Sequence, residues 1–230
     1  MTDGRVLLIT GASSGIGAAT ARAAAAEGWR LVLAARSLDR LEELAAELGG
    51  AERAVAVECD VTEWADQQAA VIAAAEQFGR LDAAWANAGF GAERSFLGDT
   101  VEHWRSMVLT NVYGAALTFR AAIPALKETR GHLLVTGSVA GRRAIPGSLY
   151  SATKHAAHAM AEGARLELDG TGVRVTVIAP GMVNTPFFAQ VPLEEPLQPD
   201  DVARAVVWAL SQPPHVDVNE ILVRPTAQPL

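Results

Sequence analysis

Cysteine is nearly missing from this sequence of 230 residues. Cys59 is the single one, so an internal disulfide is excluded. Such sparing use of cysteine fits a reducing compartment. Cys59 lies at the end of an apolar run, and we expect it to be a buried strand residue.

Positive charge is also scarce. The chain carries 19 basic against 26 acidic residues, which gives a formal net charge of -7. Proteins that bind nucleic acid usually show a basic patch or stripe. None is visible here, so we expect no nucleic-acid partner.

Long hydrophobic runs are absent as well. No apolar stretch approaches the roughly 18 residues that a membrane span needs, and Met1-Thr2-Asp3-Gly4 does not begin a signal-peptide pattern. We therefore expect a soluble, cytoplasmic protein with no membrane partner. No repeat, linker or change of composition interrupts residues 1–230, so the sequence predicts one domain.

Short apolar runs alternate with helical stretches along the whole chain. The predicted strands are residues 5–10, 29–35, 53–58, 81–86, 132–136, 173–178 and 220–223. The predicted helices are residues 18–27, 37–48, 62–78, 100–129 with a break near Gly114, 148–168 and 201–210, with Thr62 and Thr100 as N-caps. Because the strands are continuous apolar runs, the pattern predicts an α/β fold: a doubly wound (Rossmann) parallel sheet of about seven strands with helices on both faces.

A glycine-rich turn lies between the first strand and the first helix. It contains Gly11, Ser13, Ser14, Gly15, Ile16 and Gly17. Small residues let the backbone approach a pyrophosphate, and the helix that follows offers free N–H groups and the positive end of its dipole. The turn therefore predicts a nucleotide site, although its spacing differs from GxGxxG, and a glycine-rich turn without a ligand is the alternative.

The end of the second strand bears on the choice between NADP and NAD. An acidic residue about twenty positions after the glycines binds the ribose of NAD, whereas an arginine accommodates the 2′-phosphate of NADP. Arg36 lies 19 residues after Gly17, and Ala34 and Ala35 precede it. The sequence favours NADP over NAD, with Arg36 as an exposed helix-start residue the alternative.

Polar or small residues also follow the third and fourth strands. Asp60 and Val61 are placed to contact an adenine, although Asp60 is equally suited to cap the next helix. Asn87, Ala88 and Gly89 offer a passage for the cofactor. Asn87 could instead tie neighbouring strands together.

Tyr150 and Lys154 stand four residues apart in a predicted helix and so share one face. A positive charge close to a phenol favours the phenolate and lowers the pKa of the tyrosine. The pair is then suited to general acid–base catalysis. An exposed helical pair without a catalytic role is the alternative.

Taken in order, these motifs resemble the classical short-chain dehydrogenases/reductases over essentially the whole chain. The resemblance adds Asn111, Gly137-Ser138 and Pro180-Gly181 to the motifs above. It implies one domain that binds the dinucleotide and catalyses hydride transfer between NADP and a small carbonyl compound or secondary alcohol. Pro180, Gly181, Val183 and Thr185 are implied as further cofactor contacts.

The resemblance also implies the role of each catalytic residue. Tyr150 is the general acid/base, Lys154 lowers its pKa and binds the nicotinamide ribose, and Ser138 holds the substrate oxygen. Asn111 supports a water molecule that relays protons. No metal is expected, and His155 and His158 are predicted to be surface or subunit-contact residues.

The substrate pocket is predicted from the segments that follow the strands. Its candidates are Phe90, Phe96, Val139, Ala140, Ile145, Met182, Phe187 and Phe188. Residues 180–199 contain five prolines and are predicted to form a substrate lid, with an ordinary crossover loop as the alternative. One of Arg142 and Arg143 could face an anionic substrate group, or both could face solvent.

Several alternatives stay open. A non-catalytic NADP-binding regulator would keep the fold without the reaction, and a nucleotide-sugar epimerase would need a longer chain. The run from Asn219 to Thr226 is similar to the ending of bacterial 3-hydroxy-acid and serine dehydrogenases, so 3-hydroxy acids are an alternative substrate class. The resemblance implies a homodimer or homotetramer.

Overall fold

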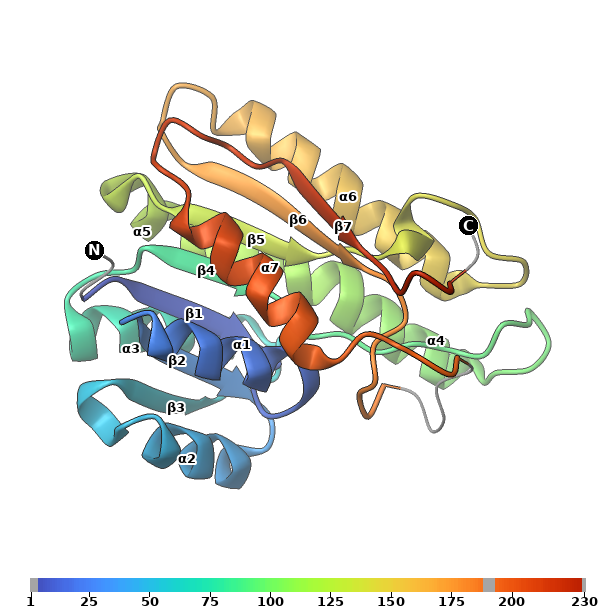
Figure 1. Ribbon diagram of the computed structural model, residues 1–230, viewed down its shortest axis with the longest axis horizontal. Helices are drawn as coiled ribbons and strands as arrows, with labels where there is room; N and C mark the ends of the chain where they lie inside the picture. Colours follow the sequence, from blue (N-terminus) through green and yellow to red (C-terminus); the bar gives the residue numbers. More distant parts are fainter. Residues whose placement is uncertain (1–3, 188–192, 229–230) are drawn as a thin grey trace.

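Seven parallel strands form one sheet in the computed structural model, which describes residues 4–187 and 193–228 (Figure 1). In chain order they are β1 (Val6–Thr10), β2 (Arg30–Ala35), β3 (Ala54–Glu58), β4 (Ala83–Ala86), β5 (His132–Thr136), β6 (Arg174–Pro180) and β7 (Glu220–Val223). Their order across the sheet is β3-β2-β1-β4-β5-β6-β7. The chain thus places β2 and β3 on one side of β1. It then crosses back, and β4 pairs with the other side of β1. Ligands of open α/β sheets bind at the carboxyl ends of the strands beside such a reversal.

Helices cover both faces of the sheet. They are α1 (Gly15–Ala26), α2 (Leu38–Glu47), α3 (Trp64–Phe78), α4 (Val101–Val108), α5 (Ala115–Thr129), α6 (Leu149–Glu167) and α7 (Pro199–Ser211). Short 3-10 turns lie at η1 (Gly50–Glu52) and η3 (Val139–Gly141), and a π-helix, η2 (Leu109–Gly114), joins α4 to α5.

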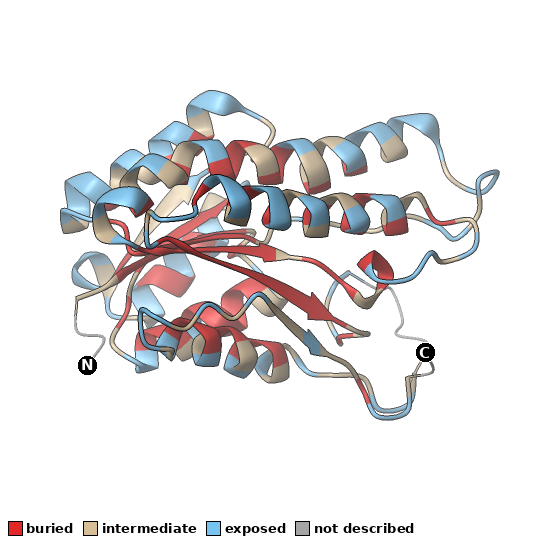
Figure 2. Ribbon diagram, turned by 90° about the horizontal axis from the view of Figure 1, so that it is seen from above, coloured by how far each residue is buried: buried red, intermediate tan, exposed pale blue. Residues whose placement is uncertain are grey.

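Two hydrophobic cores lie on opposite faces of the strands. Val6 and Leu8 of β1 pack with α3, α5 and α6, whereas Leu7 and Ile9 pack with α1, α2 and α7. Figure 2 shows the buried strands between these layers. A strand that is buried on both faces must be apolar at every position, so β1 reads as a continuous apolar run.

The predicted fold class is confirmed, and the differences concern where elements begin. Thr100 caps α4 as predicted, because its side chain accepts a hydrogen bond from the His103 N–H at 3.1 Å. Thr62 does not cap α3, since Glu63 is the N-cap and the Thr62 hydroxyl donates to Asp60 at 2.8 Å. The predicted helix at 201–210 begins earlier, at Pro199.

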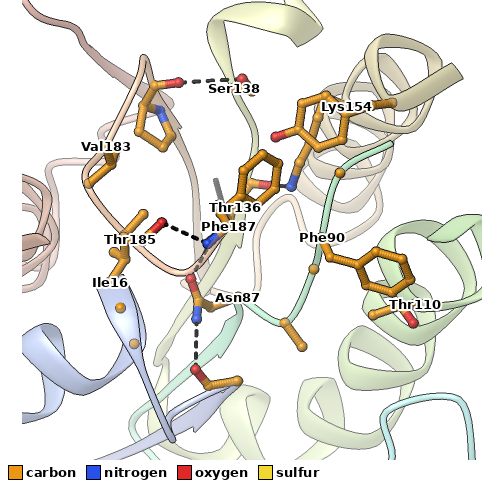
Figure 3. Close-up of a pocket in the computed structure, with 18 of the residues that line it drawn as sticks. Ile16, Asn87, Phe90, Thr110, Thr136, Ser138, Lys154, Val183, Thr185 and Phe187 are labelled. Atoms are coloured by element: carbon orange, nitrogen blue, oxygen red, sulfur yellow. Dashed lines mark hydrogen bonds between the residues drawn. The ribbon is translucent and has the colours of Figure 1, made fainter. Parts of the chain in front are cut away.

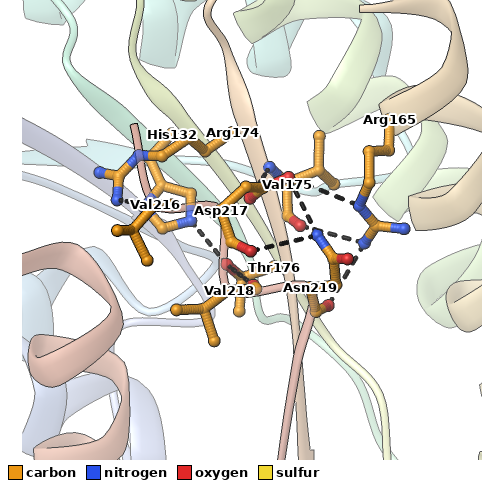
Figure 4. A network of polar contacts seen from close by, with 9 residues as sticks. All are labelled: His132, Arg165, Arg174, Val175, Thr176, Val216, Asp217, Val218 and Asn219. Atoms are coloured by element: carbon orange, nitrogen blue, oxygen red, sulfur yellow. Dashed lines mark hydrogen bonds and ion pairs between the residues drawn. The ribbon is translucent and has the colours of Figure 1, made fainter. Parts of the chain in front are cut away.

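A polar network lies at the end of the sheet that is remote from the glycine turn (Figure 4). It joins the start of β5, the start of β6 and the residues that lead into β7. The ring of His132 lies 2.7 Å from the Thr176 hydroxyl, and this hydroxyl donates to the Val218 carbonyl at 2.5 Å. Asp217 accepts hydrogen bonds from the Val175 N–H at 3.1 Å and the Asn219 amide at 3.0 Å. Burial, followed by the charges of Arg174 and Arg5, holds the pKa of His132 well below its usual value. The network therefore works with a neutral histidine and fixes β7 at the sheet edge.

A buried glutamine supports the π-helix. Gln67 of α3 has no exposed surface, and its amide nitrogen lies 3.0 Å from the Val61 carbonyl, 3.1 Å from the Gly114 carbonyl and 3.0 Å from the Thr118 hydroxyl, so its two hydrogens are shared among three acceptors. A Cβ on Gly114 would lie 2.7 Å from Val61 Cγ2, so the π-helix approaches the end of β3 closely. Gln67 thereby joins three segments around one point.

None of the helices in residues 4–187 and 193–228 is both long enough and apolar enough to cross a membrane.

Replacing Gln67 by alanine should lower the free energy of unfolding by about 1–3 kcal/mol, because it removes the buried amide that donates to the Val61 and Gly114 carbonyls. Its neighbour Gln68 is exposed and supplies the matched control, Gln68→Ala, for which we expect a change within about 0.5 kcal/mol. Urea unfolding followed by circular dichroism measures both. Equal midpoints for the two variants would contradict the structural role of Gln67.

Candidate active site

A cavity of about 540 Å³ opens at the carboxyl ends of the strands (Figure 3). The predicted residues that line it are Gly11, Ser13, Ser14, Gly15, Ile16, Gly17, Arg36, Asp60, Val61, Asn87, Ala88, Gly89, Phe90, Ser138, Val139, Ala140, Ile145, Tyr150, Lys154, Pro180, Gly181, Met182, Val183, Thr185 and Phe187. Asn111 lies behind the wall, Phe96 lies outside the cavity, and Phe188 falls outside the described residues.

The glycine turn comes very close to the end of β4. Gly11 has a φ of +67°, and a Cβ on it would lie 2.9 Å from the Cα of Ala88. A Cβ on Gly17 would collide with the Gly11 carbonyl oxygen. Glycine is therefore required at both positions by packing. The turn leads directly into α1, so the free N–H groups of the first helical turn face the cavity.

Asn87 fastens the ends of three strands. Its backbone N–H donates to the Thr10 hydroxyl at 3.0 Å, and its side-chain nitrogen donates to the Thr10 carbonyl at 3.0 Å. Its side-chain oxygen accepts from the Thr136 hydroxyl, also at 3.0 Å. The strand-tying role that the sequence left open for Asn87 is thus present, and it does not prevent Asn87 from lining the cavity.

Asn111 clamps the segment that follows β4. Its side-chain oxygen accepts from the Phe90 N–H at 3.0 Å, while its nitrogen donates to the Phe90 carbonyl at 2.9 Å and to the Thr153 hydroxyl at 3.1 Å. The π-helix η2 places this side chain, and the predicted break near Gly114 is its C-terminal end. A Cβ on Gly89 would lie 2.9 Å from the Asn111 oxygen and 3.7 Å from Lys154 Nζ, so the glycine keeps a path open to both groups.

Ser138 lies two residues after the end of β5 and is the N-cap of the turn η3. Its hydroxyl accepts from the Ala140 N–H at 3.1 Å and reaches the Pro180 carbonyl at 3.4 Å. It is almost fully buried, with 7% of its surface exposed, and it also hydrogen-bonds Tyr150. Tyr150 and Ser138 therefore present two hydroxyl groups side by side.

Lys154 is buried beneath Tyr150. Its ammonium donates to the Thr136 carbonyl at 2.7 Å and lies 5.7 Å from the centre of the Tyr150 ring. Burial lowers the pKa of Lys154 to about 8. The ammonium is therefore held by the end of β5 and does not hydrogen-bond the phenol.

The sequence predicts a lowered pKa for Tyr150, and the chain by itself shows the opposite. Burial raises the pKa of Tyr150 to about 12, which the hydrogen bond with Ser138 only partly offsets. The prediction counted the attraction of a cation and overlooked the cost of removing a phenolate from water.

Arg36 and Asp60 lie together at the far end of the cavity. Asp60 accepts from the Thr62 N–H at 2.9 Å and from the Thr62 hydroxyl, and these hydrogen bonds, together with the nearby charge of Arg36, hold the pKa of Asp60 below its usual value. Asp60 thus fixes the turn before α3 rather than capping that helix. Arg36 is exposed.

Aromatic rings line the opposite end of the cavity. Phe187 meets Tyr150 edge to face with ring centres 5.4 Å apart, and Phe90 stacks on His103 at 5.3 Å. Arg142 pairs with Glu220 of β7, so it is held at the surface; Arg143 is exposed. Neither arginine lines the cavity.

Other residues of the site were not found from the sequence. Arg94, Thr110 and Gln228 also line the cavity, and Thr136 holds Lys154. Gln228 carried no signal, because it stands 46 residues after the segment that it contacts.

His158 corrects a sequence prediction. We expected a surface or subunit-contact residue, but only 14% of its side chain is exposed, and its ring fills the space beside Gly137 and Gly141. A Cβ on Gly141 would lie 2.6 Å from the ring. Burial, followed by the charge of Arg142, lowers the pKa of His158 to about 4. A neutral imidazole therefore backs the turn that presents Ser138.

Within residues 4–187 and 193–228, no three His, Cys, Asp or Glu side chains gather as a metal site would require.

Comparisons with known proteins agree with this geometry. Residues 5–196 match the short chain dehydrogenase family. An uncharacterized oxidoreductase of Staphylococcus aureus (strain MRSA252) is 40% identical over 229 residues, which covers 98% of each chain.

Two solved structures illustrate the likeness in three dimensions. The alcohol dehydrogenase from the archaeon Thermococcus sibiricus, complexed with 5-hydroxy-NADP, is 35% identical with a TM-score of 0.90, covering 98% of each chain. The 3-ketoacyl-(acyl-carrier-protein) reductase from Brucella melitensis, complexed with NADH, is 31% identical with a TM-score of 0.90, covering 97% of this chain and 98% of the other. The family model matches most of this chain, and the cavity lies at the strand ends. The chain therefore belongs to the short-chain dehydrogenases/reductases and is an oxidoreductase.

Proposed function

We propose that this protein is an NADP-dependent oxidoreductase that transfers a hydride between the nicotinamide and a small carbonyl compound or secondary alcohol. The observation that carries the proposal is the meeting of Tyr150, Ser138 and Lys154 in the cavity that also contains the glycine turn. The proposal includes residues 1–230 as one catalytic domain and residues 180–199 as its substrate lid.

The cavity suits a dinucleotide. Its volume of about 540 Å³ lies in the range typical of cofactor sites. A Cβ at Gly11 would crowd the backbone of Ala88 and one at Gly89 would crowd the Asn111 side chain, and α1 supplies N–H groups for a pyrophosphate. Gly11, Ser13, Ser14, Gly15, Ile16 and Gly17 would hold the phosphates, and Asp60, Val61, Asn87, Ala88 and Gly89 the adenosine half. Tyr150, Lys154, Pro180, Gly181, Val183 and Thr185 would hold the nicotinamide half.

The preference for NADP rests on Arg36. This guanidinium is exposed beside the cavity at the end of β2, where Ala34 and Ala35 are apolar and offer no carboxylate to a ribose. Asp60 is the nearby acid, and its hydrogen bonds to Thr62 already occupy one of its oxygens. A 2′-phosphate would pair with Arg36 through charge-assisted hydrogen bonds.

The bound nicotinamide would supply or accept the hydride. Tyr150, whose phenol stays protonated at neutral pH, would donate a proton to the substrate oxygen during reduction. Ser138 would hold that oxygen through its hydroxyl, and the ammonium of Lys154 would stabilise the phenolate as it forms. Asn111 would position the Phe90 backbone and the water that relays a proton towards Lys154.

The substrate end is apolar. Phe90, Val139, Ala140, Ile145, Met182 and Phe187 line it, and Phe188 is proposed as a further contact. Such a surface suits a small carbonyl compound with an apolar part. 3-Hydroxy acids remain the second substrate class.

Tyr150→Phe should reduce kcat for NADPH oxidation by about 10²–10⁴-fold, because the proton donor of the reaction is lost. The chain offers a matched control, since Tyr113 is its other tyrosine and is exposed. Tyr113→Phe should keep full activity. Stopped-flow or steady-state absorbance at 340 nm with a panel of ketones and aldehydes measures both.

Equal rates for Tyr150→Phe and wild type would overturn the catalytic assignment. NADPH binding by a wild-type protein that turns over no compound of the panel would favour the non-catalytic regulator.

Arg36→Asp should weaken NADPH binding by at least tenfold and leave NADH binding nearly unchanged, because the new carboxylate repels the 2′-phosphate and suits a free ribose hydroxyl. Arg105→Asp makes the same change of charge on α4 as a control and should affect neither nucleotide. Isothermal titration of the wild type and both variants with NADPH and NADH gives the dissociation constants. Equal losses of affinity for NADPH and NADH would contradict the assignment of Arg36 to the 2′-phosphate.

The rate of carbonyl reduction should fall as the pH rises through about 8. The pKa of Lys154 lies there, and above it the amine no longer favours the negative charge that develops on Tyr150. The phenol itself stays protonated well beyond this range, because its pKa is about 12. A kcat profile from pH 6 to pH 10 measures the effect, and Lys154→Met should be slower and show no inflection. A wild-type profile that stays flat to pH 10 would contradict the role of the ammonium.

A further inference from the structure

The last described residues of the chain return to the cavity. Beyond β7, residues 224–228 form a turn in which the Gln228 N–H donates to the Pro225 carbonyl at 3.1 Å. The Gly181 N–H donates to the Val223 carbonyl at 2.7 Å, so the end of β7 lies beside the segment that leaves β6. The Gln228 side chain then lines the cavity.

Gln228 makes one specific contact there. Its side-chain oxygen accepts a hydrogen bond from the Met182 N–H at 2.8 Å. A Cβ on Gly181 would collide with this oxygen and would lie 2.7 Å from the Cβ of Arg224. The absence of a side chain at position 181 is therefore what lets the amide of Gln228 reach the backbone.

The contact completes the fixation of Met182. Its carbonyl accepts from the Leu197 N–H at 3.0 Å, and the Asn184 N–H donates to the Leu197 carbonyl at 2.7 Å. Leu197 thus holds residues 182–184 from one direction, and Gln228 holds Met182 from the other. Val183 between them is 4% exposed and lines the cavity.

We propose that Gln228 is a positioning residue for the nicotinamide end of the cofactor site. By fixing the Met182 N–H, its side-chain oxygen sets the backbone of Met182 and Val183, against which the nicotinamide carboxamide would lie. This inference depends on the proposed function for one point, the identity of the bound nucleotide. It makes the turn at residues 224–228 part of the active site.

Gln228→Met removes the accepting oxygen and keeps the length of the side chain. Its affinity for NADPH should fall about tenfold, and kcat should fall by a similar factor. Its affinity for 2′-phospho-ADP-ribose, which lacks only the nicotinamide, should stay within twofold of wild type. NADH and ADP-ribose form a parallel pair of ligands.

Gln228→Glu provides the rescue, because a carboxylate oxygen still accepts from the Met182 N–H. It should recover most of the NADPH affinity. Gln228→Asn keeps the amide on a side chain that is one methylene shorter, and it should behave like Gln228→Met. Gln68→Met is the surface control and should match wild type in every measurement.

Three results would overturn the positioning role. They are an unchanged NADPH affinity in Gln228→Met, an equal loss for NADPH and 2′-phospho-ADP-ribose, and no recovery in Gln228→Glu. Failure of the proposed function has a different signature, namely a wild-type protein that binds neither nucleotide pair or that binds NADPH without turnover. The comparison of the two ligands still tests Gln228 in the second case.

Discussion

The site depends on keeping the ends of β1, β4 and β5 together where the order of strands reverses. Parallel strands are joined by backbone hydrogen bonds only as far as the ladder runs. Beyond the ladder, the side chain of Asn87 joins the strand ends. Its nitrogen donates to the Thr10 carbonyl on β1, and its oxygen accepts from the Thr136 hydroxyl on β5. Thr136 in turn offers its carbonyl to Lys154. The buried ammonium of Lys154 is therefore positioned by Thr136, which is also one of the residues that join the strand ends.

That arrangement has an energetic cost that the fold accepts. Burying a lysine and a tyrosine disfavours the charged form of each, so the pKa of Lys154 falls to about 8 while the pKa of Tyr150 rises to about 12. The Thr136 carbonyl and the Ser138 hydroxyl compensate part of this cost by hydrogen bonding. Sites that hold ionisable groups in this way are commonly functional, because burial tunes them for proton transfer.

The sequence predicts most of the fold because strand and helix signals here are local. The apolar runs that become strands are buried on both faces, and the residues that follow them necessarily meet at one edge of the sheet. This is why nearly all candidates, from Gly11 to Phe187, line one cavity.

What the sequence does not predict depends on contacts between distant segments or on burial. Gln228 reaches Met182 across 46 positions, and the clamp of Asn111 on Phe90 crosses 21 positions. His158 looks like a helix-surface residue until Gly137 and Gly141 are seen to leave room for its ring. The rise in the pKa of Tyr150 follows from its surroundings, which spacing along a helix does not reveal.

The π-helix that carries Asn111 has a consequence for how this chain tolerates insertions and deletions. A π-helix differs from an α-helix by one additional residue in a turn. Each residue of an α-helix advances the chain by about 100° around the axis. Loss of one residue between Leu109 and Gly114 would restore regular winding and turn Asn111 away from Phe90, or Gly114 away from Gln67. A single residue in this segment therefore separates a continuous α-helix from one that holds Asn111 against Phe90 behind the wall of the cavity.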